Sequence, residues 1–175
     1  MPELIAPTVS LHTAWLEARD DWGPGVHEDG FGLRPSDEVD SPAGFAAWVA
    51  RLTAQSDPAT PLEAGQAHCT YRWIVEGDQV LGGIALRHEL ANDFLQRIAG
   101  HIGYGIRPSA RQRGLATWAL GRMLEEARGL GLDRVLICCA TDNVASAKTI
   151  ERHGGVLEDV WDTELGAVRR YWVKL

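Results

Sequence analysis

Apolar residues recur with two different periods in the central part of the chain. Within residues 98–106 apolar side chains alternate with small or polar ones, which predicts a strand. Pro108 ends this strand, because proline has no backbone N–H to donate to a neighbouring strand. From residue 111 to residue 129 the apolar positions follow the helical period instead. The sequence therefore predicts a strand, a turn and a helix in succession.

The same two periods divide the rest of the chain. Two apolar stretches meet at Gly77-Asp78, a pair of residues typical of a hairpin turn. Long segments rich in glycine, proline and polar residues predict loops at 23–41, 56–66 and 90–96. The other strands are expected at residues 3–8, 69–76, 79–88, 134–140, 156–161 and 168–173. The other helices are expected at residues 11–22, from residue 42 past residue 52, and at 143–153.

The order of these elements predicts the fold class. A strand, a helix and a second strand between residues 98 and 140 require a right-handed crossover and a parallel pair. The remaining strands follow one another closely enough to pair antiparallel. We therefore expect an α/β (α+β) fold, a mixed and mostly antiparallel sheet of about six or seven strands with helices on both faces. Its 175 residues fit a single domain, 1–175.

Charge and composition exclude several classes of protein. The net charge is −7, and the acidic excess lies in residues 1–65. An acidic chain without a basic stripe argues against nucleic-acid binding. The acidic cluster, which includes Asp20, Asp21, Glu28, Asp29 and Asp37, is either a solvated surface or a rim that attracts a cationic amine.

Targeting signals and metal motifs are also missing from the sequence. No run of 18 apolar residues occurs, so no membrane span is expected. The first residues lack the basic start and apolar core of a signal peptide. The three cysteines favour a reducing compartment, so we expect a cytoplasmic protein. No Cys/His spacing resembles a zinc site, and no metal is expected.

A basic, glycine-containing turn joins the central strand to the helix after it. Its sequence is Arg111-Gln112-Arg113-Gly114-Leu115-Ala116. The first turn of a helix carries N–H groups that have no intrahelical partner, and the helix dipole is positive there. Such a turn is suited to an anion, above all a phosphate.

This turn resembles the pyrophosphate motif of the GNAT superfamily of N-acetyltransferases, Q/R-x-x-G-x-G/A. About thirty residues downstream, the segment from Asp142 to Ala147 and the later Gly154-Gly155 are similar to the second signature of that superfamily. The chain also resembles a poorly characterised bacterial branch of it. The resemblance implies a GNAT fold and an acetyl-CoA-dependent N-acetyltransferase. It further implies an acetyl-CoA-binding core over 68–175, acceptor-side helices and loops over 1–67, and a homodimer as one frequent assembly.

The resemblance also assigns residues to acetyl-CoA. The backbone from Gln112 to Thr117 would bind the pyrophosphate, while the pantetheine arm would pair with the strand around Gly105. Asn143 would bond the pantetheine amides, but it would serve equally well as a helix N-cap. The expected cofactor-binding residues are Gly105, Ile106, Arg111, Gln112, Arg113, Gly114, Leu115, Ala116, Thr117 and Asn143.

The catalytic positions depart from the superfamily pattern. Where relatives carry a Glu base on the fourth strand, this chain has His101, and where they carry a Tyr acid, it has Ile150. His101 is either the base or a core histidine satisfied by a neighbour. Glu89 and Tyr104 are the other catalytic candidates. His88 could reach the same cleft, and Tyr171 could replace the missing acid.

Three functions remain open from the sequence. The first is acetyl transfer to an amine of a small molecule or a peptide, with Trp22 as one residue that could line the acceptor pocket. The second is a protein that binds CoA or acyl-CoA and regulates without turnover, an alternative suggested by the missing Tyr. The third is an enzyme for another phosphate ligand that uses the same turn.

Overall fold

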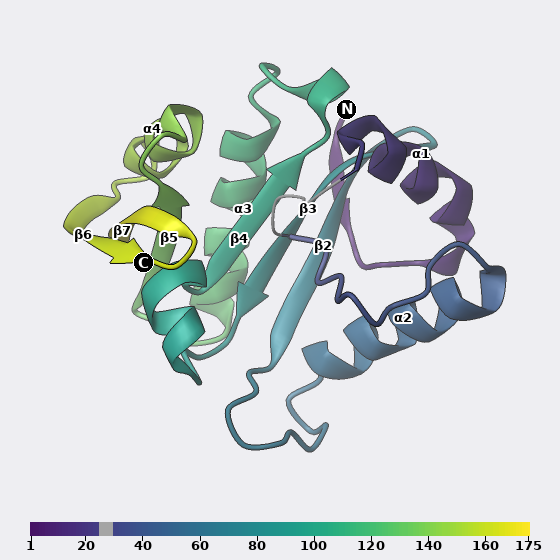
Figure 1. The fold of residues 1–175 in the computed structure, drawn as a ribbon, viewed down its shortest axis with the longest axis horizontal. Helices are drawn as coiled ribbons and strands as arrows, with labels where there is room; N and C mark the ends of the chain where they lie inside the picture. The colour runs from purple at the N-terminus through teal and green to yellow at the C-terminus, as the bar shows by residue number, and fades with distance from the viewer. Residues whose placement is uncertain (25–29) are drawn as a thin grey trace.

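The computed structural model describes residues 1–24 and 30–175 of the chain. Within these residues a single sheet of seven strands runs through the molecule in the order β1-β2-β3-β4-β5-β7-β6 (Figure 1). This sheet confirms the expected α/β fold. The strands are β1 (Glu3–Ile5), β2 (Cys69–Glu76), β3 (Gln79–Arg87), β4 (Ile102–Ile106), β5 (Arg134–Ala140), β6 (Val156–Thr163) and β7 (Gly166–Lys174).

Helices cover both faces of the sheet, as the sequence predicts. On one face lie α1 (His12–Trp22) and α2 (Pro42–Ser56), and on the other lie α3 (Leu115–Gly129) and α4 (Val144–Arg152) (Figure 1). Each pair closes its own hydrophobic core. Trp15, Trp48 and Trp73 dominate the core beneath α1 and α2. The core beneath α3 and α4 is built from smaller side chains of the helical stripe, including Leu120, Met123 and Ile150.

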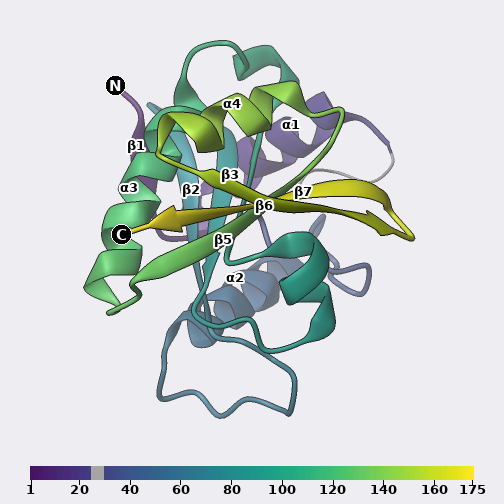
Figure 2. The same cartoon turned by 90° about the vertical axis from the view of Figure 1, so that its left-hand side faces the viewer.

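The parallel pair of strands separates soon after it forms. All other neighbouring strands pair antiparallel, but β4 and β5 are parallel and share the single register pair Ile102–Ile137. Beyond Ile102 the two strands diverge, while β5 continues to pair with β7 along its whole length. The β6–β7 hairpin forms the edge of the sheet that faces the viewer in Figure 2. On the side away from β3, the carboxyl half of β4 therefore has no neighbouring strand among the described residues.

The expected strand over Ile98–Ile106 is too long at its start. Residues Leu95–Ala99 form a π-helical turn, and β4 begins only at Ile102. Gly100 has φ of +67° and its N–H bonds to Leu95 O at 2.7 Å, a geometry that closes a helical turn. The apolar residues at 95, 98, 99 and 102 follow a helical period, but Ile98 and Ile102 also continue the alternation of Tyr104 and Ile106, which explains the wrong boundary.

The helix after the turn also starts later than expected. The helical pattern suggested a start near Arg111, but α3 begins at Leu115, and a short 3₁₀ helix, Pro108–Ala110, follows β4. The residues between them are held away from helical geometry by Gln112 and Gly114, with φ of 62° and 76°. None of the described helices has the length and apolar character needed to cross a membrane.

Candidate active site

The turn between β4 and α3 forms one wall of a cavity of about 420 Å³. We call it the turn cavity. The end of β4 forms a second wall, and α4 forms the third. The described lining residues are Tyr104, Gly105, Ile106, Ala110, Arg111, Gln112, Gly114, Leu115, Ala116, Thr117, Asn143, Ala145, Ser146, Lys148, Thr149 and Arg152.

The backbone of the turn presents a row of free donors. The first helical hydrogen bond of α3 runs from Trp118 N to Gly114 O at 3.0 Å. Among the described residues, no hydrogen bond is donated by the main-chain N–H groups of residues 112–117. Gly114 has φ of +76°, and a Cβ placed there would meet no atom within 4 Å. Small residues and free amides at a positive helix end make a site for an oxyanion.

Positive side chains surround this cavity from two sides. Arg111 lines it, and its Nε donates to Ile106 O at 3.0 Å, which ties the turn to the end of β4. Lys148 and Arg152 line it from α4. The sequence analysis missed this pair, although the i, i+4 spacing of two cations places them on one helix face. Arg113, by contrast, is outside the lining and bonds to Glu76 at 2.7 Å.

The edge of β4 that points away from β3 faces the same cavity. Arg107 N donates to Leu81 O at 2.8 Å, and His101 O accepts from Arg87 N at 2.7 Å, so odd-numbered residues of this segment bond to β3. Because bonding directions alternate along a strand, Tyr104 and Ile106 turn their backbone groups toward the gap between β4 and β5. An extended ligand with amide groups can pair with such an edge.

A second cavity, of about 690 Å³, opens on the α1 side of the same gap. We call it the aromatic cavity. Its described lining residues are Trp15, Arg19, Trp22, Phe31, Gly32, Leu33, Arg34, Pro35, Arg87, Phe94, Ile98, Ala99, Ile102, Gly103, Tyr104, Cys138, Cys139, Asn143 and Ser146. Tyr104, Asn143 and Ser146 line both cavities, so the two meet where β4 and β5 separate.

Hydroxyl groups gather at this junction. The Tyr104 hydroxyl and Ser146 Oγ are 2.7 Å apart. Asn143 caps α4, because its Oδ1 accepts a hydrogen bond from Ser146 N at 3.1 Å. The N-cap role expected for Asn143 is therefore present, and its side chain also lies at the junction. Ser146 was not among the residues expected from the sequence.

A sequence profile described as an acetyltransferase (GNAT) domain matches residues 24–156. The chain belongs to the GNAT acetyltransferase family. As a member of that family it is an acetyl-CoA-dependent N-acetyltransferase, as the motifs at Arg111 and Asn143 imply. A search of curated protein sequences finds no match.

Several solved structures share the fold of this acetyltransferase. RimJ of Mycobacterium smegmatis, in complex with CoA-disulfide, has a TM-score of 0.74 and 14% identity over 99% of this chain and 81% of its own. The ribosomal-protein-S5-alanine acetyltransferase of Vibrio fischeri has a TM-score of 0.73 and 15% identity, covering 99% and 92%. RimL, a ribosomal L7/L12 alpha-N-protein acetyltransferase in complex with coenzyme A, gives 0.71 and 18%, covering 99% and 94%.

In this acetyltransferase, His101 is not among the described lining residues of either cavity. The side chain is 7% exposed, and its Nδ1 accepts a hydrogen bond from Leu136 N at 2.9 Å. Burial, together with the nearby Arg87 and Arg134, lowers the pKa of His101 to about 4. The imidazole is therefore neutral and holds β5 beside the start of β4. This placement differs from the expected base on the strand, because His101 precedes β4 and follows the left-handed Gly100.

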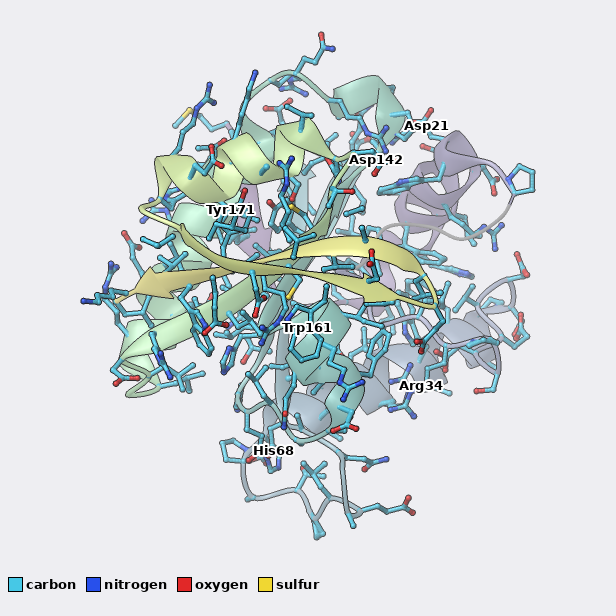
Figure 3. The ribbon with its side chains drawn as sticks, turned by 60° about the vertical axis from the view of Figure 1, so that its left-hand side comes forward. Asp21, Arg34, His68, Asp142, Trp161 and Tyr171 are labelled. Atoms are coloured by element: carbon cyan, nitrogen blue, oxygen red, sulfur yellow. The ribbon has the colours of Figure 1, made fainter. Side chains whose placement is uncertain are left out.

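The other candidates for acid or base lie apart from the junction as well. Glu89 is exposed beyond the end of β3, outside the lining of both cavities. His88 Nε2 bonds to Thr70 Oγ1 at 2.8 Å, and burial lowers the pKa of this histidine. Tyr171 lies beside α4 (Figure 3), donates to Glu151 at 3.0 Å and has its pKa raised by burial. Of the expected catalytic residues, only Tyr104 lines the cavities.

The position of the missing Tyr is filled by a core residue. Ile150 is fully buried in the core beneath α3 and α4, so α4 offers no hydroxyl there.

Cys138 lines the aromatic cavity, but burial raises the pKa of its thiol to about 12. A thiol with such a pKa stays protonated at neutral pH and is a poor nucleophile. Among the described residues there is no group of three or more metal-ligating side chains.

The described acids of the acidic cluster form internal contacts and do not line either cavity. Asp20 and Asp40 pair with Arg19, and Asp37 pairs with Arg51. The described part of the cluster therefore does not form a rim for a cationic amine. Glu28 and Asp29 lie outside the described residues.

Proposed function

We propose that the turn cavity holds acetyl-CoA and the aromatic cavity holds the amine acceptor, a peptide or a small molecule. The observation that carries this proposal is the junction, where the two cavities share Tyr104, Asn143 and Ser146. A thioester laid along the edge of β4 would end at this point. The acceptor then reaches it from the opposite side of the sheet.

The residues present fit coenzyme A. The free amides of residues 112–117 supply donors to a pyrophosphate, and each hydrogen bond to a charged group is worth about 1.5–3 kcal/mol. Arg111, Lys148 and Arg152 supply positive charge beside it. The backbone of Tyr104 and Ile106 supplies pairing groups for pantetheine amides. When bound, acetyl-CoA supplies an activated acetyl thioester.

The junction explains how this chain manages without the usual Tyr. During transfer a C–N bond forms to the acetyl carbon, the C–S bond breaks, and the thiolate takes up one proton. The hydroxyls of Tyr104 and Ser146, 2.7 Å apart, form a relay that can donate this proton. The described lining of both cavities contains no carboxylate and no histidine, and we assign the removal of the amine proton to water.

The acceptor class is supported by the relatives that share this fold. RimL is named an alpha-N-protein acetyltransferase, and the Vibrio fischeri protein a ribosomal-protein-S5-alanine acetyltransferase. An amino-terminal amine on a peptide is therefore one acceptor that this fold accommodates. The aromatic cavity also has room for a small amine.

Titration with CoA tests the cofactor site. Gly114→Glu places an anion in the row of free amides, and we expect it to weaken CoA binding by about a hundredfold or more. Gly131→Glu is the matched control, because Gly131 also has a positive φ, of 83°, and open space around its Cβ. Equal CoA affinity in the wild type and both variants would contradict the proposed site.

A second candidate function is CoA sensing without turnover. The lack of a carboxylate or histidine in the described lining favours it, because no dedicated base lies at the junction. A panel of amines and short peptides, followed by detection of the released thiol, separates the two functions. Release of CoA with any physiological acceptor excludes the sensor.

A further inference from the structure

The aromatic cavity carries an unusual charge for a site that receives an amine. Its described lining includes three arginines, Arg19, Arg34 and Arg87, and contains no aspartate or glutamate. The described lining offers a protonated amine no counter-charge, so an arginine there without an acidic partner is suited to a different, anionic part of the acceptor.

Two of the three arginines already have partners. Arg19 pairs with Asp40 at 2.7 Å and with Asp20 at 3.1 Å. Arg87 donates to Ala99 O at 3.5 Å. The guanidinium of Arg34 is exposed and makes no hydrogen bond or ion pair with any described residue. It is therefore available to a ligand.

The loop that carries Arg34 is held in place on both sides. Arg34 N donates to Asp37 Oδ2 at 2.7 Å, and Asp37 pairs with Arg51 at 2.5 Å. Arg51 also donates to Gly32 O at 2.9 Å.

Aromatic packing fixes Phe31, three residues before Arg34. Phe31 is 8% exposed, and its ring meets those of Trp15 and Trp22 at 5.8 and 5.6 Å. Arg34, labelled in Figure 3, therefore stands on an ordered wall between α1 and α2. Because the backbone that carries Arg34 is already held, less entropy is lost when its side chain binds a ligand.

We propose that Arg34 is a specificity-determining residue that selects acceptors carrying a carboxylate in addition to the reacting amine. This inference rests on the proposed function, because it names the acceptor class of the same site. The planar guanidinium binds a carboxylate through two parallel hydrogen bonds. With the carboxylate held at Arg34, the aromatic side chains enclose the carbon skeleton and the amine is directed to the junction at Tyr104. The carboxylate belongs either to an acidic peptide or to a small amino acid.

Fluorescence titration of the CoA-loaded protein tests the inference, because Trp15 and Trp22 line the cavity. Two matched pairs of probes are used, each with a free amine. The first is the peptide amide Ala-Ala-Glu-Glu against Ala-Ala-Gln-Gln, and the second is 6-aminohexanoate against its amide. We expect the wild type to bind at least one carboxylate probe about tenfold more tightly than its neutral partner. That preference should weaken as salt is raised.

Three variants assign the preference to Arg34. Arg34→Gln should reduce it to less than about twofold and leave the neutral probes unchanged. Arg34→Lys should retain part of it, since the charge remains but the paired hydrogen bonds are lost. Arg128→Gln, at an exposed position near the end of α3, is the matched control and should behave as the wild type. The CoA affinity of each variant reports whether it is folded.

The outcomes separate this inference from the proposed function. If CoA binds but charged and neutral probes bind equally to the wild type, the inference is overturned and the cofactor site stands. If Arg34→Gln keeps the preference, the assignment to Arg34 is overturned. If CoA does not bind, the proposed function fails, and the probes still report the charge preference of the cavity. The probe pair that shows the preference identifies a peptide or a small molecule as the source of the carboxylate.

Discussion

At the scale of single residues, the proposed chemistry depends on Tyr104 and Ser146. Both line the two cavities, and their hydroxyls are within hydrogen-bond distance. A thiol with a pKa near about 8.5 leaves readily as the thiolate, so the acid contributes less here than in reactions with poorer leaving groups. In the proposed function, the contribution expected of the hydroxyl pair is therefore a modest one, the delivery of a proton to the departing thiolate.

Removing the Tyr104 hydroxyl tests this role. We expect Tyr104→Phe to lower kcat about tenfold or more, while the CoA dissociation constant changes less than about twofold, because general acids contribute to the chemical step. Thiol release and CoA titration measure the two quantities. Tyr171→Phe is the control, since Tyr171 lies outside both cavities and its hydroxyl bonds to Glu151. A kcat equal to that of the wild type in Tyr104→Phe would assign the proton to Ser146 or to water.

His101 gives a prediction about pH. Because its pKa is lowered to about 4 in the folded protein, the unfolded chain, with a pKa near about 6.5, binds more protons between these values. Stability should therefore fall as the pH is lowered from about 6.5 to about 4. His101→Asn retains an acceptor near the position of Nδ1 and does not titrate. Denaturant unfolding across this range should show a smaller pH dependence in the variant, with kcat preserved. An unchanged pH dependence would mean that another group carries the effect.

His101 also shows that a sequence motif does not determine the direction in which a side chain points. Its position in the motif matches a catalytic base of relatives, and that correspondence was the whole basis of the assignment. The direction of the side chain depends on where β4 starts and on the left-handed Gly100, and neither is visible in the spacing. The amides of residues 112–117 were predictable, because glycine and the helix start determine them locally.

At the scale of elements, one carboxylate joins α1 to the segment between β4 and α3, which carries the proposed cofactor turn. Asp21, near the end of α1 (Figure 3), accepts hydrogen bonds from Ser109 Oγ at 2.6 Å, Arg107 Nε at 2.9 Å and Ser109 N at 3.1 Å. These bonds, first from Ser109 and then from Arg107, lower the pKa of Asp21 to about 2. The 3₁₀ helix that leads into the turn is thereby fixed to α1.

Breaking this link should affect the cofactor site at a distance. We expect Asp21→Asn to raise KM for acetyl-CoA several-fold and to lower Tm by a few degrees, because the turn loses one of its supports. Steady-state kinetics and thermal unfolding measure both. The lowered pKa means that the stabilisation is present above about pH 4 and is lost as the pH falls toward 2. Asp20→Asn is the control, since Asp20 is exposed and contacts only Arg19 among the described side chains. Identical effects of both substitutions would refute a specific link.

The period of the apolar residues predicts which elements form better than it predicts where each element begins. The strands and helices of the core were expected within a few residues of their positions, because their apolar stripes are long. The segment Leu95–Ala99 was not, since Ile98 fits both the helical period of this segment and the alternation of β4, and Gly100 decides between them. The aromatic cavity was equally hidden, because it is lined by α1, the loop at Arg34 and the diverging strands, which are distant in sequence.

At the scale of the whole molecule, the sign of the net charge differs from the sign of the charge that lines the two cavities. The chain has a net charge of −7, yet the described lining of both cavities contains cations and no carboxylate. The acids of the N-terminal region are used in contacts such as Asp21 with Arg107 and Asp37 with Arg51. The net charge therefore says little about the ligands, and the sign of each cavity must be taken from its lining.

Coenzyme A should stabilise the whole molecule, because it connects α3, α4 and the edge of β4. At a hundred times its dissociation constant a ligand adds about 2.7 kcal/mol to the stability of the folded state. For a domain of this size, that corresponds to a rise in Tm of about 5–10 °C. Thermal unfolding with CoA, ATP and NAD at equal concentrations measures the effect. We expect CoA to give the largest rise, and Gly114→Glu to remove it while Gly131→Glu retains it. A larger rise with ATP or NAD would instead indicate that the turn binds another phosphate ligand.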